Sequence, residues 1–135
     1  MKKTLFIVTM LFVNQLFSQS EIEIALNFQN TLRSYYYHDD LTLDNELSVE
    51  ATKWARHLIT NDVFKFENDS GENLFSIPTS NLPINYNPYL DASIGWTIDA
   101  DDLDPLNNIL DPNYKYLGIG IAKSNDEIIV VVKYK

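Results

Sequence analysis

The feature that most constrains the fold is a run near the C-terminal end of the chain, residues 128–132 (IIVVV), which is apolar at every position. A strand with one solvated face alternates apolar and polar residues, so this unbroken run predicts a strand covered on both faces. Residues 116–122 are also strand-like, and the short polar segment 123–126 between the two runs predicts a hairpin. The sequence therefore predicts a small sheet with other elements packed on both sides.

Helical patterns precede this hairpin. Residues 22–37 place apolar side chains at three- and four-residue spacing, and residues 44–60 do the same behind Asp44, a favourable N-cap. A third helix is expected from residue 88 or 89 to about residue 101. Because 135 residues are enough for one domain and too few for two, we expect a single domain over residues 21–135. Helices around a short buried sheet predict an α+β fold, a three-layer α-β-α sandwich.

The first 20 residues have the pattern of a secretory signal. Two lysines precede an apolar run of nine residues, 5–13, and the small residues Ser18 and Ser20 follow. A membrane span needs about 20 apolar residues, so this run is too short for one, and no later segment is long and apolar enough. We expect cleavage after Ser18 or Ser20, which the pattern leaves open, and a mature protein that is secreted or periplasmic.

The composition excludes several classes of function. Ten basic and nineteen acidic side chains give a net charge of −9, which disfavours binding to nucleic acid or to anionic lipid. The chain has no cysteine, so disulfides, thiolate zinc sites, iron–sulfur clusters and cysteine nucleophiles are all excluded. For an exported protein this means that the fold depends on its core alone.

Several short motifs follow one another in the order typical of a known family. They are residues 29–33 (QNTLR), 43–47 and 51–55 (LDNEL and ATKWA), 71–74 (GENL), 96–99 (WTID) and 108–120 (NILDPNYKYLGIG). Together they resemble the CAP superfamily of cysteine-rich secretory proteins, antigen 5 and pathogenesis-related proteins, also called the SCP domain. The GENL motif is the most specific of them. The resemblance covers about residues 22–134 and implies a CAP/SCP-like sandwich.

The same resemblance implies a degenerate cleft. Members of the family often hold two histidines and two acidic residues there, a set able to bind zinc. In this chain Phe66 or a neighbour of it, and Pro105, stand where the histidines are expected, while Glu72, beside Asn73, and Asp99 stand at the acidic positions. Neither a phenylalanine nor a proline side chain can ligate a metal, so no metal or cofactor is expected.

The titratable residues leave two interpretations of Glu72. The two histidines, His38 and His57, match no cleft position of the family, and we expect both at the surface. Glu72 and Asp99 could act as a general acid and base, which would make the protein a metal-independent hydrolase of peptide or cell-wall material. Alternatively, Glu72 accepts backbone hydrogen bonds that hold its own loop, and we favour this second interpretation.

The densest acidic stretch is residues 99–104 (DADDLD). It lacks the glycine and the final glutamate of a calcium-binding loop, although weak calcium binding stays open. The function most consistent with these features is that of an exported, non-enzymatic binding or interaction module. The resemblance implies a small lipid, a glycan or a protein as ligand, and the sequence leaves the oligomeric state open.

Overall fold

The computed structural model describes the backbone from residue 2 and the side chains from residue 19 to residue 135. The predicted signal segment, residues 1–20, therefore lies outside the residues whose side chains are described, except for Gln19 and Ser20. In chain order the elements are α1 (Lys2–Tyr35), β1 (Thr42–Leu43), α2 (Asn45–Asn61), β2 (Glu72–Pro78), α3 (Pro88–Ile98), α4 (Asp104–Leu110), β3 (Tyr116–Lys123) and β4 (Glu127–Tyr134).

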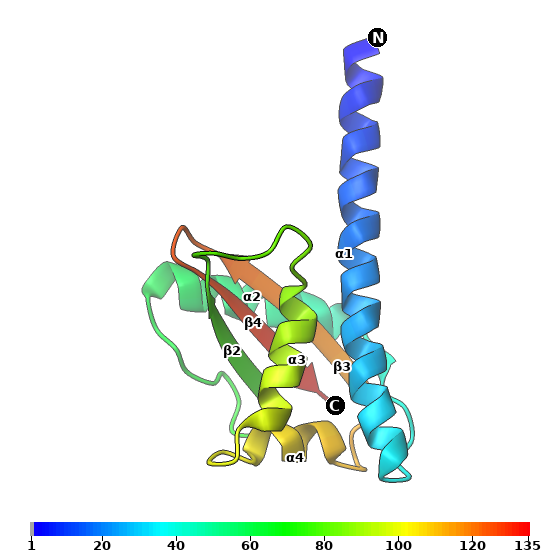
Figure 1. Cartoon of the computed structure of the whole chain (residues 1–135), viewed down its shortest axis with the longest axis vertical. Coiled ribbons are helices and arrows are strands. Elements are labelled where there is room, and N and C mark those ends of the chain that lie inside the picture. The colour runs from blue at the N-terminus through cyan, green and yellow to red at the C-terminus, as the bar shows by residue number, and fades with distance from the viewer. Residues whose placement is uncertain (1) are drawn as a thin grey trace.

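The sheet has the strand order β1-β3-β4-β2, which places β4 between two neighbours (Figure 1). Strand β4 pairs antiparallel with both β3 and β2, and the short strand β1 pairs parallel with β3. The residues from Ile129 to Val132 are 0% exposed. The sequence-based prediction of a hairpin whose last strand is covered on both faces is confirmed.

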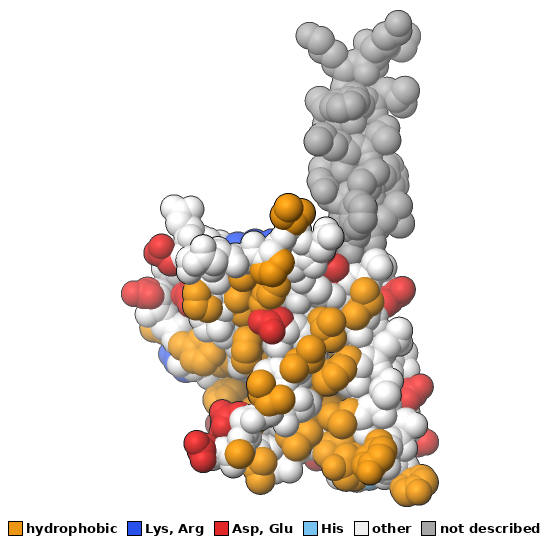
Figure 2. Space-filling model, in the orientation of Figure 1, with side chains coloured by type: hydrophobic (Ala, Val, Ile, Leu, Met, Phe, Trp, Pro, Cys, Tyr) orange, Lys and Arg blue, Asp and Glu red, His pale blue; other side chains and the backbone are white. Residues whose placement is uncertain are grey.

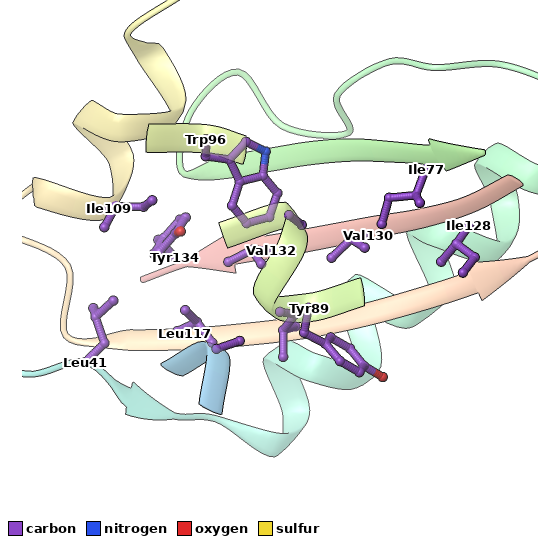
Figure 3. Close-up of a cluster of buried hydrophobic side chains, with 13 residues drawn as sticks. Leu41, Ile77, Tyr89, Trp96, Ile109, Leu117, Ile128, Val130, Val132 and Tyr134 are labelled. Atoms are coloured by element: carbon purple, nitrogen blue, oxygen red, sulfur yellow. The ribbon is translucent and has the colours of Figure 1, made fainter. Parts of the chain in front are cut away.

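Helices cover both faces of this sheet. On one face, Ala51, Ala55 and Leu58 of α2 pack against alternate residues of β4, including Ile129 and Val131. On the other face, α1 and α3 close a larger core, in which Trp96 and Tyr89 of α3 lie with Val130 and Val132 (Figure 3). Alternate residues of one strand thus serve two cores, as expected from strand geometry. The predicted α+β three-layer sandwich is confirmed.

Glycines of β3 determine how closely α2 approaches the sheet. A Cβ atom on Gly118 would lie 2.3 Å from the backbone carbon of Leu47, and one on Gly120 would lie 2.3 Å from the nitrogen of Thr52. Both distances are far below van der Waals contact, and the atoms met belong to the helix backbone. The glycines therefore permit a helix–sheet contact that any larger residue would force apart.

The helix ends follow local chemistry. The Asp44 side chain accepts a hydrogen bond from the Leu47 N–H at 2.9 Å, which confirms the predicted N-cap of α2. Helix α3 ends at Ile98, three residues before the predicted end at about residue 101. Asp99 adopts an extended conformation and its carboxylate accepts from the Asp101 N–H instead, which turns the chain out of the helix. Among the helices whose side chains are described, none combines the length and the apolar run that crossing a bilayer requires.

Candidate functional site

Glu72 begins β2 and its side chain is buried, with 1% of it exposed. The preceding residue, Gly71, has a φ of +70°, a conformation that favours glycine, and its carbonyl accepts from the Tyr134 N–H. One carboxylate oxygen of Glu72 accepts from the Glu67 N–H at 3.0 Å. The other accepts from the Lys133 ammonium at 3.1 Å. Both oxygens of Glu72 therefore hold structural partners.

Lys133 lies directly opposite Glu72 in the pairing of β4 with β2. Its ammonium group is 2.8 Å from a Glu67 carboxylate oxygen as well, and only 2% of its side chain is exposed. Burial alone would lower the pKa of this ammonium, but the hydrogen bonds to Glu67 and Glu72 outweigh it and raise the pKa. Sequence reasoning missed Lys133, although a lysine that continues a fully apolar strand needs a carboxylate partner if it is buried.

A cavity of about 240 Å³ opens beside this ion pair. Its lining includes Phe66, Glu72, Asn73 and Pro105, so the structure brings together four of the five residues that the sequence assigned to the cleft. Phe66 and Pro105, which were predicted to replace the family's histidines, thus share a cavity with Glu72.

Asp99, the fifth residue assigned to the cleft, is not among the described residues that line this cavity. It is exposed at the end of α3, where its carboxylate accepts from the backbone N–H groups of Asp101 and Asp102 at 3.0 and 3.3 Å. Asp102 and Asp104 line the cavity instead, and sequence reasoning did not assign them to it. Within residues 19–135, no three acidic or histidine side chains are grouped as a bound metal would require.

The side-chain amide of Asn73 also makes hydrogen bonds that hold the fold together. Its nitrogen donates to the Pro105 carbonyl at 3.0 Å, and its oxygen accepts from the Asn108 amide at 2.8 Å. The same nitrogen lies 3.4 Å from the hydroxyl of Tyr134, which in turn donates to Gln29 on α1 at 2.8 Å. Burial raises the pKa of the Tyr134 hydroxyl, so this hydroxyl remains a donor. A buried polar network therefore ties β2 and α4 to α1.

Arg33, near the end of α1, likewise makes hydrogen bonds that hold the fold together. Its guanidinium is fully buried and donates to the backbone carbonyls of Asp39, Ile109, Asp111 and Tyr114, at 2.8 to 3.1 Å. Desolvation lowers the pKa of this guanidinium. The arginine thus holds the end of α1 against the end of α4, a role in the fold and not in a site.

Neither histidine is among the residues lining the cavity. His57 is exposed on α2, stacks on Trp54 with ring centroids 4.6 Å apart and contacts the Asn61 amide. His38 is half-buried in the loop after α1. The central glutamate therefore has a lysine, and neither imidazole, as its described side-chain partner.

Residues 26–134 match the profile of a protein family described as CAP, cysteine-rich secretory protein family. The chain belongs to this family. It does so without any cysteine, and the motifs that predicted the CAP domain are those that hold Arg33, Glu72 and Asn73 in place. No match was found among curated proteins.

Solved structures show the same fold. MpPR-1i matches with a TM-score of 0.61 and 19% identity, over 87% of each chain. The hookworm platelet inhibitor matches with a TM-score of 0.60 and 17% identity, over 86% of this chain and 67% of its own. An outer surface protein of Borrelia burgdorferi matches with a TM-score of 0.59 and 17% identity, over 87% and 94%. At these identities the likeness establishes the CAP sandwich alone.

Proposed function

We propose that this CAP domain is an exported, non-enzymatic binding or interaction module. The observation that carries the proposal is the pairing of Glu72 with the Lys133 ammonium and the Glu67 N–H inside the cleft. A catalytic carboxylate needs a free lone pair within reach of the group it deprotonates, and a metal ligand needs one for the metal. Here each carboxylate oxygen of Glu72 already accepts a hydrogen bond from a group of the fold.

Lys133 also bears on the electrostatics of the cleft. A buried carboxylate requires a compensating positive charge, which a bound cation could otherwise supply. In this chain the ammonium supplies that charge from the central strand. A cleft with Phe66 and Pro105 in place of histidines and with an internal cation supports a domain that functions without zinc.

The alternative, a metal-independent hydrolase, has less support. It requires Glu72 and Asp99 to act on one substrate, whereas Asp99 is exposed and bonds to its own turn. The aspartates among the described residues that line the cavity are Asp69, Asp102 and Asp104, and all three are exposed to solvent.

The cavity suits a small polar group. Its volume of about 240 Å³ lies below the range of roughly 300–1,000 Å³ typical of small-molecule sites. Carboxylates and amides, from Asp69, Asn68 and Asn107 among others, line it beside the ring of Phe66. A sugar ring or a side chain of a partner protein fits this lining better than a lipid tail does.

The proposed export rests on residues 1–20. Their charged start, apolar run and small residues match a signal peptide, and one protein with the same fold is an outer surface protein of Borrelia burgdorferi. Amino-terminal sequencing of the exported protein should therefore begin at Gln19 or Glu21. Recovery of all of the protein inside the cell, with residues 1–20 still attached, would contradict the proposal.

Two measurements test the role of Glu72. The full chain, equilibrated with Zn²⁺ and then desalted, should retain no stoichiometric zinc. Peptide and peptidoglycan probes should not be cleaved, and Glu72→Gln should lower stability without changing that result. Cleavage by the wild type that is lost in both Glu72→Gln and Asp99→Asn, but kept in the matched variant Asp101→Asn, would establish the hydrolase instead.

A further inference from the structure

Strand β3 has an edge that β1 covers only in part. The pairing of β1 with β3 involves Tyr116 and Leu117 alone, and β3 continues to Lys123. In an antiparallel ladder alternate residues direct their backbone groups away from the partner strand. Leu117 does so, because its carbonyl accepts from the Asp44 N–H at 2.9 Å, and the Ile119 N–H donates to the Ser48 hydroxyl at 3.2 Å.

By the same alternation Ile121 directs its N–H and carbonyl to this edge. On the β1 side of β3, no strand of the described chain pairs with it beyond Leu117. A row of backbone groups on such an edge is a template for a further strand. The Ser48 hydroxyl satisfies one of these groups, the Ile119 N–H, but it is a side chain and adds no strand to the sheet.

A cavity of about 390 Å³ lies over this edge. Its lining comes from both helical layers: Ile22 of α1 on one side, and Val49 and Thr52 of α2 on the other, with Ile119 and Ile121 of β3 between them. In a three-layer sandwich a single sheet separates the two helical layers, so the space between these layers at the edge of the sheet is as thick as one strand. The cavity therefore occupies the position that a longer β1 would fill.

The cavity over the edge of β3, called the slot from here on, differs in charge from the rest of the surface. Lys53 and Arg56, three residues apart on α2, line it, and none of the described lining residues is acidic. Neither forms an ion pair with a described side chain. Acidic side chains are spread over the face shown in Figure 2, and the whole chain carries −9. The slot thus attracts negative charge on a protein that otherwise repels it.

We propose that an extended segment of a partner protein, with alternating acidic and apolar residues, binds in this slot as an added strand of the sheet. Its backbone would pair with the Ile119 carbonyl and with the N–H and carbonyl of Ile121, because the Ile119 N–H is already bonded to Ser48. Successive side chains of a strand point to opposite faces, so the acidic ones would face Lys53 and Arg56 while the apolar ones face Ile22. This surface is separate from the Glu72 cavity, so the two proposals succeed or fail independently.

The probe is a labelled octapeptide of alternating glutamate and isoleucine, titrated with the full chain in a fluorescence anisotropy assay. We expect saturable binding that weakens as salt is raised, and slower hydrogen exchange of the Ile121 amide in the complex. Lys53→Glu/Arg56→Glu should weaken binding by at least about tenfold, because it places like charges opposite each other. The matched pair Lys65→Glu/Lys135→Glu changes the net charge equally outside the slot and should leave binding unchanged.

Methylation of the peptide backbone separates strand addition from attraction of charge. Methyl groups on the alternate amides that face β3 should abolish binding, whereas methyl groups on the other alternate amides should be tolerated. Equal binding of both methylated peptides, or of a peptide with its glutamates grouped at one end, would overturn the proposal. It would be overturned equally by an unchanged affinity in the slot variant, or by binding of dodecanoate in place of the peptide.

Discussion

At the scale of single residues, the two ion pairs of Lys133 contribute unequally to the stability of the fold. The ammonium is closer to Glu67 than to Glu72, at 2.8 and 3.1 Å, but 43% of the Glu67 side chain is exposed whereas Glu72 is buried. An exposed pair is screened by water and contributes little, while a buried charge left without its partner is costly. The longer of the two contacts is therefore the more important one.

Replacing Lys133 by methionine should lower the free energy of unfolding by about 3–5 kcal/mol, since it leaves the Glu72 carboxylate buried and uncompensated. Glu67→Gln should cost about 1 kcal/mol or less. Urea denaturation followed by circular dichroism measures both. Adding Glu72→Gln to the methionine variant should recover part of the loss; equal costs for the two single variants would contradict this ranking.

At the scale of elements, the contact of α2 with β3 depends on residues that have no side chain. At Gly118 a Cβ would meet the backbone of α2, which can move only with the whole helix. At Gly95, in α3, it would meet the outer ring atoms of Phe75, a half-buried side chain. Comparing one substitution at each position therefore distinguishes a backbone neighbour, which cannot move alone, from a side-chain neighbour, which can.

Gly118→Ala should destabilise the domain by about 1–3 kcal/mol, because overpacking against a backbone forces the layers apart. Gly95→Ala should be close to neutral, since helix propensity gains about 1 kcal/mol while the Phe75 ring adjusts. The midpoints of urea denaturation distinguish them. A larger loss at Gly95 than at Gly118 would show that the ring of Phe75, and not α2, is the rigid neighbour.

Elements with a strong local signal could be predicted from the sequence. The run 128–132 predicted the central strand, and Asp44 predicted the start of α2. Strand β1 could not be predicted, because its two residues carry no periodicity and their partners lie more than 70 positions away along the chain. The end of α3 was misplaced because the Asp99 side chain competes with the helix for backbone N–H groups.

The same distinction applies to the candidate site. Glu72, Phe66 and Pro105 could be placed near one another because motifs carry their positions, and the cavity contains all three. The partnership of Lys133 with Glu72 depends on the register of β4 against β2, which no local pattern encodes. Asp99 was placed by its motif in the cleft, yet its carboxylate bonds to the turn after α3.

At the scale of the whole molecule, the buried hydroxyl and ammonium groups determine how stability depends on pH. Burial raises the pKa of Tyr134 above its ordinary 10.0, burial and the bond to Asp91 raise that of Tyr86, and the pKa of Lys133 is raised as well. Above pH 10 the folded chain therefore holds protons that the unfolded chain has released. Unfolding releases protons in this range, so stability falls as pH rises.

We expect the free energy of unfolding to decline above pH 10, with Tyr134 contributing up to about 1.4 kcal/mol per pH unit. Tyr134→Phe should lower stability at neutral pH, because Gln29 and Asn73 lose a partner, but should make the alkaline decline less steep. Denaturation series at several pH values between neutral and alkaline measure both effects. An unchanged slope in the variant would show that Tyr134 ionises in the folded state as it does in water.

The position of β4 also affects the order in which the parts of the fold can assemble. The strand at the centre of the sheet is the last element of the domain, and both of its neighbours, as well as α2, pack against it. Contacts between distant parts of a chain form slowly, and here the pairings of β4 with β2 and β3 can form only after the final strand has emerged. The sheet therefore closes only when its last strand in the chain has joined β2 and β3.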